Sequence, residues 1–212
     1  MKINYTDFQK ELNKQFSTIP HLITECLIRH WFIETQKINA EIEVPYYRSK
    51  APFTPIKLKT GKKTYIKNSR FRADLYVNGE DTVIEFKYHR QTKYSNIATA
   101  TNMGEVFNDL NRLSLSDNEE KYFIYVFDQK MKDYYEKHSP FDMLKISEIK
   151  VGNTYKIDDK KDKVIAGGYA EFKKVAFKFF PKRKFKDFDY IVRVEYANKI
   201  CDDYYLIVYK VD

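Results

Sequence analysis

Residues 70–88, with the sequence RFRADLYVNGEDTVIEFKY, carry an aspartate, a glutamate and a lysine at positions that can share one face of a β-sheet. The Asn-Gly pair at positions 78 and 79 is the strongest short signal for a tight hairpin, because both residues accept the positive φ angles of a type I′ turn. Side chains alternate between the two faces along each strand. We therefore expect Asp74, Glu85 and Lys87 on one face of a hairpin.

A two-residue turn also fixes how the two strands pair. It sets Asp74 opposite Val83 and diagonal to Glu85, at a separation where one divalent cation can bridge two carboxylates. Lys87 lies beside them, two residues further on. The opposite face of the hairpin is apolar and predicts a core side, formed by Ala73, Leu75, Val77, Ile84 and Phe86.

A simpler alternative is a half-exposed hairpin whose outer face happens to be charged. The acid-x-Lys tripeptide is not selective by itself, since it recurs elsewhere in the chain, for example at Glu119 and Glu148. Only Glu85 combines a predicted strand, an aspartate on the partner strand and an apolar run on the opposite face. That context favours a chemical site at the hairpin.

The hairpin resembles the catalytic centre of the PD-(D/E)XK nuclease superfamily, which has an aspartate on one strand and Glu-x-Lys on the next. Asp74 followed by Glu85, Phe86 and Lys87 fits this pattern, and Ala73 stands where the family name has proline. The resemblance implies that Asp74, Glu85 and the backbone carbonyl of Phe86 bind Mg²⁺, for which Mn²⁺ can substitute. It also implies that Lys87 positions the attacking water.

Many members of that superfamily add a glutamate from the first helix, and this chain offers two. Glu25 lies at the more usual distance before the first strand. Glu34 shares a helical stripe with Leu27 and His30, and an acid on an apolar stripe costs free energy unless it is paired or binds metal. Both remain candidates, with Glu25 placed first.

The periodicity of apolar residues predicts the elements that position these side chains. A helix capped by Ser17 or Thr18 is followed by three strands, a helix whose Asp109 and Arg112 form a surface pair, and a further strand. The predicted bounds are Pro20–Gln36 for the first helix, then 38–47, 70–77 and 80–88 for the strands, 101–115 for the second helix and 121–127 for the last strand.

This order, αβββαβ, is that of the superfamily core. The resemblance therefore implies an α/β (α+β) restriction-endonuclease-like core over residues 1–140, with a mixed central sheet flanked by helices. A polar connector follows that last strand, and residues 141–212 read as a β-rich extension that ends in a hairpin of 190–196 with 204–211. The extension either widens the sheet or forms a small subdomain that grips the substrate.

The net charge of +8 on 212 residues indicates a polyanionic partner. No acidic residue lies between Glu43 and Asp74, and a second acid-free segment, 172–186, interleaves seven basic residues with five phenylalanines. Basic and aromatic residues together suit phosphate contacts and base stacking, although the phenylalanines of 172–186 are equally consistent with a core. The nucleic-acid-binding candidates are Lys57, Lys59, Lys62, Lys63, Lys67, Arg70, Arg72, Arg112, Lys178, Lys182, Arg183, Lys184 and Lys186.

Other features bound the setting of the protein. Cys26, on a helix predicted to bury it, and Cys201 form no metal or redox spacing, and no run of 18 apolar residues occurs. We expect a cytoplasmic protein with reduced thiols and no membrane partner. No heptad pattern is present, so the sequence leaves open whether the chain forms a homodimer.

These observations and the resemblance lead to one expectation for function. We expect a Mg²⁺-dependent endonuclease that hydrolyses DNA, most naturally double-stranded DNA, as a small restriction-type or defence enzyme. The main alternative is a non-catalytic nucleic-acid-binding module on the same fold. A β-rich interaction protein with a basic surface and no nucleic-acid role is a third alternative.

Overall fold

A computed structural model of the chain describes residues 2–45, 56–57, 63–64, 72–90, 99–114, 116, 118–139, 142–158, 189–201 and 203–212. Its elements follow one another in the order α1 (Tyr5–Thr18), η1 (Pro20–Leu22), α2 (Glu25–Gln36), β1 (Ala40–Pro45), β2 (Ile56–Lys57), β3 (Lys63–Thr64), β4 (Arg72–Val77), β5 (Thr82–His89), α3 (Thr99–Ser114), β6 (Glu120–Asp128), α4 (Gln129–His138), η3 (Asp142–Leu144), β7 (Thr154–Asp158), β8 (Asp189–Lys199) and β9 (Tyr204–Val211).

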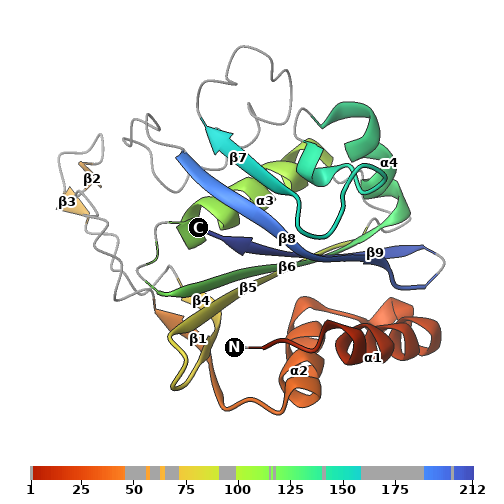
Figure 1. The fold of residues 1–212 in the computed structure, drawn as a ribbon, viewed down its shortest axis with the longest axis horizontal. Helices are drawn as coiled ribbons and strands as arrows, with labels where there is room; N and C mark the ends of the chain where they lie inside the picture. Colours follow the sequence, from red (N-terminus) through yellow and green to blue (C-terminus); the bar gives the residue numbers. More distant parts are fainter. Residues whose placement is uncertain are drawn as a thin grey trace.

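The described residues form an α/β protein with four α-helices and a seven-stranded mixed open sheet. The strand order is β1-β4-β5-β6-β9-β8-β7, in which β5 and β6 are parallel and all other neighbours are antiparallel. Helices α1 and α2 cover one face of this sheet, and α3 and α4 cover the other (Figure 1). The short strands β2 and β3 pair with each other.

Each face of the sheet has its own apolar core, because the central strands are buried on both sides. Strand β5 alternates Ile84 and Phe86 toward α1 and α2 with Val83 toward α3. A strand covered on both faces is expected to be nearly continuous in apolar residues, and β6 (EKYFIYVFD) has this composition. The alternative of a half-exposed hairpin with a charged outer face is therefore wrong, since α3 covers that face.

The predicted order of helix, three strands, helix and strand is observed in α2, β1, β4, β5, α3 and β6. The second predicted helix is confirmed as α3, whose Met103, Phe107 and Leu110 are buried. The connector after β6 is not irregular: it forms α4, and the Asp128 side chain caps that helix by accepting the backbone N–H of Met131 at 2.9 Å.

The N-terminal part of the prediction needs three corrections. Helix α1 was not anticipated, although Phe8, Leu12 and Phe16 recur at helical spacing and are buried. The next helix begins at Glu25 rather than Pro20, and its cap is Thr24, whose hydroxyl accepts the backbone N–H of Leu27, so neither Ser17 nor Thr18 caps it.

The buried stripe of α2 also differs from the prediction, which placed Leu27, His30 and Cys26 inward. Arg29 and Phe32 are buried instead, while Cys26 and His30 are exposed. The difference reflects tertiary packing, because buried residues of α2 belong to one core cluster with buried residues of α1. The Phe8 and Phe32 rings meet edge to face at 5.1 Å between centroids.

The hairpin pairs in a different register from the one predicted. Val77 pairs with Thr82, so the loop has four residues, 78–81, and the positive φ angles fall at Gly79 and Asp81. The register moves by two residues, and such a shift leaves Glu85 and Lys87 on the face opposite Ile84 and Phe86. Ala73 is an exception, because it was predicted to share a face with Leu75 but belongs to the core on the α3 side. Continued by one residue, the register sets Asp74 opposite Glu85 rather than diagonal to it.

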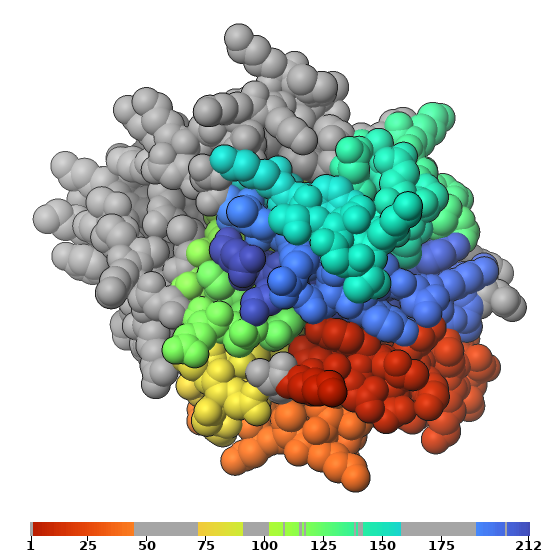
Figure 2. Space-filling view, in the orientation of Figure 1, coloured from red at the N-terminus to blue at the C-terminus, as the bar shows by residue number. Residues whose placement is uncertain are grey.

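Of the two alternatives for residues 141–212, the described strands widen the sheet. The predicted hairpin is confirmed in β8 and β9, and β9 pairs with β6. The N-terminal helix borders these strands on the face shown in Figure 2. The Tyr5 ring of this helix stacks on Tyr196 of β8 with 5.4 Å between centroids. The domain boundary at residue 140 remains a prediction. Among the described helices, none is long and apolar enough to span a membrane.

Candidate active site

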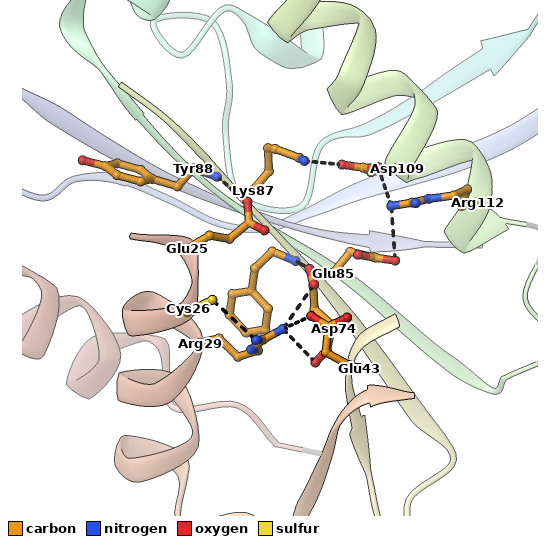
Figure 3. A network of polar contacts seen from close by, with 11 residues as sticks. Glu25, Cys26, Arg29, Glu43, Asp74, Glu85, Lys87, Tyr88, Asp109 and Arg112 are labelled. Atoms are coloured by element: carbon orange, nitrogen blue, oxygen red, sulfur yellow. Dashed lines mark hydrogen bonds and ion pairs between the residues drawn. The ribbon is translucent and has the colours of Figure 1, made fainter. Parts of the chain in front are cut away.

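The candidate site lies where β4 and β5 separate. Their backbones pair only over residues 75–77 and 82–84. Beyond this point a side chain of β4, that of Asp74, accepts a hydrogen bond from the backbone of β5. The backbone N–H of Phe86 donates to Asp74 Oδ2 at 2.7 Å, and Arg29 Nη1 lies 3.3 Å from Asp74 Oδ1 (Figure 3). Both carboxylate oxygens are thus fixed relative to β5 and α2.

A cavity of about 230 Å³ opens at this separation of the strands. All four residues that the hairpin pattern predicted for the site line this cavity, namely Asp74 on β4 and Glu85, Phe86 and Lys87 on β5. Its lining consists of Glu25, Glu43, Arg72, Asp74, Glu85, Phe86, Lys87 and Arg112.

Glu85 is the most deeply buried acid of the cavity, with 2% of its surface exposed. Burial raises its pKa well above the usual range, and the charges of Asp74 and Asp109 raise it further. Arg112 Nη2, 3.6 Å from Glu85 Oε1, acts in the opposite direction but does not cancel these effects. Glu85 therefore lies in surroundings that favour a shared proton or a bound cation over a bare carboxylate.

Lys87 reaches the same region from β5 and is surrounded by acids. Its Nζ lies 3.1 Å from Asp109 Oδ2 and 4.0 Å from Glu105 Oε2. Burial by itself lowers the pKa of an amine, but the negative charges of Asp109, Glu25 and Glu105 outweigh it and raise the pKa of Lys87. Lys87 is a cationic hydrogen-bond donor in this site.

Of the two candidate helix glutamates, only Glu25 lies at the site. As the first residue of α2, it accepts the backbone N–H of Tyr88 at 3.1 Å through Oε2. Burial, with Asp74 adding a negative charge, raises its pKa from 4.5 to about 7 despite the opposing charge of Lys87. Glu34 is exposed near the other end of the helix and does not line the cavity.

Sequence reasoning missed Arg29, which contacts Asp74, and Glu43, which pairs with Arg29. Arg29 is buried, and its Nη1 lies 3.0 Å from Glu43 Oε1 and 3.3 Å from the backbone oxygen of Asp74. Glu43 has φ +57°, an uncommon angle for a residue other than glycine. The partners of Arg29 lie on β1 and β4, far away in the sequence, and no local pattern predicts a positive φ within β1.

Asp109 and Arg112 were predicted to form a surface pair, and this was wrong for their location. They do pair, with Arg112 Nη2 2.5 Å from Asp109 Oδ1, but only 3% of Asp109 is exposed. A signal was present, since Asp109 lies three residues after the buried Val106 and four before the buried Leu113.

Few of the predicted nucleic-acid-binding residues can be placed. Arg72, which is exposed, and Arg112 line the cavity. Lys57 and Lys63 pair across β2 and β3. The others lie outside the described residues, namely Lys59, Lys62, Lys67, Arg70, Lys178, Lys182, Arg183, Lys184 and Lys186.

The donor set fits a hard divalent cation such as Mg²⁺. In the described part of the chain, no group of three or more His, Cys, Asp or Glu side chains is arranged to hold a metal by itself. Mg²⁺ does not need one, because it keeps several water ligands and usually binds through one or two carboxylates. Asp74 and Glu85 supply such a pair, and burial, the main cause of the raised pKa of Glu85, disfavours a bare carboxylate there.

Comparison with known proteins gives no match. Neither the known family models, nor the curated proteins, nor the solved structures contain a significant relative of this chain.

Proposed function

We propose that this protein is a divalent-cation-dependent endonuclease that hydrolyses DNA, with an active site of the PD-(D/E)XK type. The observation that carries the proposal is the joint lining of one cavity by Asp74, Glu85, Lys87 and Glu25, at the point where β4 and β5 separate. The element order α2, β1, β4, β5, α3, β6 supports a restriction-endonuclease-like core, because it agrees with the order that the resemblance implies.

Asp74 and Glu85 would hold the cation, together with the backbone carbonyl of Phe86. When bound, Mg²⁺ would stabilise negative charge on the phosphate oxygens and favour formation of the attacking hydroxide. Two features of the carboxylates support this role. The Phe86 N–H and Arg29 fix the orientation of Asp74, and burial makes the ionised form of Glu85 unfavourable without a nearby cation.

The remaining side chains have complementary roles in the proposed reaction. Lys87 is protonated, so it orients a water and the phosphate by donating hydrogen bonds and does not act as a base. Glu25 can hold or release a proton near neutral pH, because its pKa is about 7. Arg72 and Arg112 line the same cavity and are positioned to contact phosphate oxygens.

One observation favours the alternative of a non-catalytic nucleic-acid-binding module. Three acids of this region already have a cationic neighbour, since Arg29 lies beside Asp74, Arg112 beside Glu85 and Lys87 beside Asp109. Such a set of ion pairs is also what a purely structural cluster would contain. Cleavage and binding therefore have to be measured on the same variants.

The test is cleavage of supercoiled plasmid and linear duplex DNA with Mg²⁺ or Mn²⁺, against EDTA. Asp74→Asn should abolish cleavage, and Lys87→Gln, which removes a charged hydrogen-bond donor, should slow it by roughly 10²- to 10³-fold. Glu34→Gln, which alters an exposed glutamate of the same helix as Glu25, should leave the rate unchanged. DNA binding, measured in parallel by fluorescence anisotropy at several salt concentrations, should persist in all three variants. Salt-sensitive binding without cleavage by any preparation would leave the non-catalytic module.

A further inference from the structure

Asp109 forms ion pairs with two cationic side chains of the site. Its Oδ2 lies 3.1 Å from Lys87 Nζ, and its Oδ1 lies 2.5 Å from Arg112 Nη2 (Figure 3). Lys87 and Arg112 line the cavity, whereas Asp109 does not. Asp109 therefore acts at the site through its ion pairs with these two neighbours, and its charge also raises the pKa of Glu85.

The link continues to the acids of the site. Arg112 Nη2 is also 3.6 Å from Glu85 Oε1. The Asp109 carboxylate thus pairs with Lys87 on one side and, on the other, with Arg112, which reaches Glu85. Helix α3 holds Asp109 firmly, because the adjacent Leu110 and the nearby Val106 and Leu113 are fully buried. Burial opposes ionisation of Asp109, but Arg112 and Lys87 outweigh it and lower its pKa.

The other acids near Lys87 provide a weaker restraint. Glu105 is half-buried, its Oε2 is 4.0 Å from Lys87 Nζ, and the same oxygen lies 3.3 Å from His89 Nε2. Glu25 approaches from α2 and accepts the backbone N–H of Tyr88. Asp109 is thus the acid that makes the closest ion pair with Lys87 among the described residues.

We propose that Asp109 is a positioning residue of the site, which holds the Lys87 ammonium and the Arg112 guanidinium at the cavity without itself touching substrate. This inference rests on the proposed nuclease function. Its chemical basis is that a carboxylate carries negative charge on both oxygens and can pair with a cation through each, whereas an amide of the same shape is neutral, has one oxygen and presents an N–H group to the second cation. Asp109→Asn therefore keeps the volume and disrupts one of the two contacts.

The test compares the kinetics of Asp109→Asn with those of Asp133→Asn, which alters an exposed aspartate on α4 that accepts a hydrogen bond from Gln129. Loss of an orienting neighbour typically lowers activity by about 10- to 100-fold. We expect this loss in kcat for Asp109→Asn, with KM for DNA within about threefold of the unaltered protein, and no change for Asp133→Asn. If Asp109→Asn does not fold, Asp109→Glu replaces it, because that variant keeps the charge and changes only the reach.

A double-variant comparison separates positioning from a general structural role. If Asp109 acts through Lys87, Asp109→Asn combined with Lys87→Gln should be little slower than Lys87→Gln alone. In addition, acetylation of the Lys87 amine, followed by mass spectrometry, should be several-fold faster in Asp109→Asn than in the unaltered protein. This second measurement does not depend on cleavage.

The outcomes distinguish the inference from the function on which it rests. An unaltered protein that cleaves DNA while Asp109→Asn cleaves at the same kcat would overturn the inference alone. Multiplicative losses in the double variant, or unchanged acetylation of Lys87, would also overturn it. Failure of the unaltered protein to cleave any DNA would overturn the proposed function, and the positioning role with it.

Discussion

Replacing Glu25 with glutamine is expected to make the protein more stable at alkaline pH and less active. The folded state raises the pKa of Glu25 from 4.5 to about 7, chiefly by burial. Between these two pH values the unfolded chain has released the proton while the folded chain retains it. The contribution of this group to stability is therefore fully present below pH 4.5 and is lost as the pH rises to 7.

The magnitude follows from the size of this shift. Each pKa unit corresponds to about 1.4 kcal/mol, so the raised pKa of Glu25 destabilises the folded state by about 3 kcal/mol at pH 8, where the carboxyl is ionised. At pH 5, where only the unfolded chain has released the proton, the destabilisation is about 1 kcal/mol. Glutamine is neutral at both pH values, and its side-chain oxygen can still accept the N–H of Tyr88. Glu25→Gln should thus gain about 2 kcal/mol more at pH 8 than at pH 5.

Urea denaturation at the two pH values measures this difference, with Glu34→Gln as the matched control. Because Glu34 is exposed on the same helix, its substitution should change the free energy of unfolding by the same small amount at both pH values. A gain for Glu25→Gln that does not grow between pH 5 and pH 8 would refute the assignment of a buried, proton-retaining carboxyl. Greater stability combined with lost cleavage would indicate that this glutamate is present for chemistry and not for folding.

Two further predictions concern the packing that supports the site. Arg29→Met should lower the free energy of unfolding by about 3 kcal/mol, because it leaves the carboxylate of Asp74 without its buried partner. Its control is Arg193→Met, which alters an exposed ion pair on β8 and should lower the free energy of unfolding by less than about 1 kcal/mol. Phe86→Ala should cost about 3–5 kcal/mol by removing a buried ring that packs edge to face on Phe32, whereas the exposed Leu22 should tolerate alanine within about 0.5 kcal/mol. Urea denaturation measures both pairs, and equal losses within either pair would contradict the burial on which the prediction depends.

Local patterns were sufficient to predict which face of the hairpin carries the acids, but not its register. The Asn-Gly pair predicts a two-residue turn, yet the loop has four residues. Asp81 explains the difference, because its carboxylate accepts hydrogen bonds from Asn118 Nδ2 at 2.7 Å and from the backbone N–H of Glu119 at 3.2 Å. These contacts tie the loop to the segment before β6, and the sequence of the hairpin alone contains no trace of them.

The second shortfall concerns which polar residues the fold buries. A 3.6-residue period predicted that α2 and α3 exist, but not which side of α2 faces inward, where Phe32 packs on Phe8 of α1 and Arg29 pairs with Glu43 and Asp74. Likewise, Asp109 is polar and was placed outward, whereas β5 offers it Lys87 as a partner. A charged residue at a core position is predictable only when its counter-charges are known. Arg112 is a local partner of Asp109, but Lys87 comes from β5, and the partners of Arg29 come from β1 and β4.

The most direct test of the site is cleavage of supercoiled plasmid by the unaltered protein and by Asp74→Asn, purified in parallel and assayed with Mg²⁺ and with EDTA. Nicked or linear DNA that forms only with the unaltered protein and only with Mg²⁺ is the expected result. Equal cleavage by both proteins, or cleavage by neither, would contradict the assignment of Asp74 and its neighbours as the active site of a nuclease.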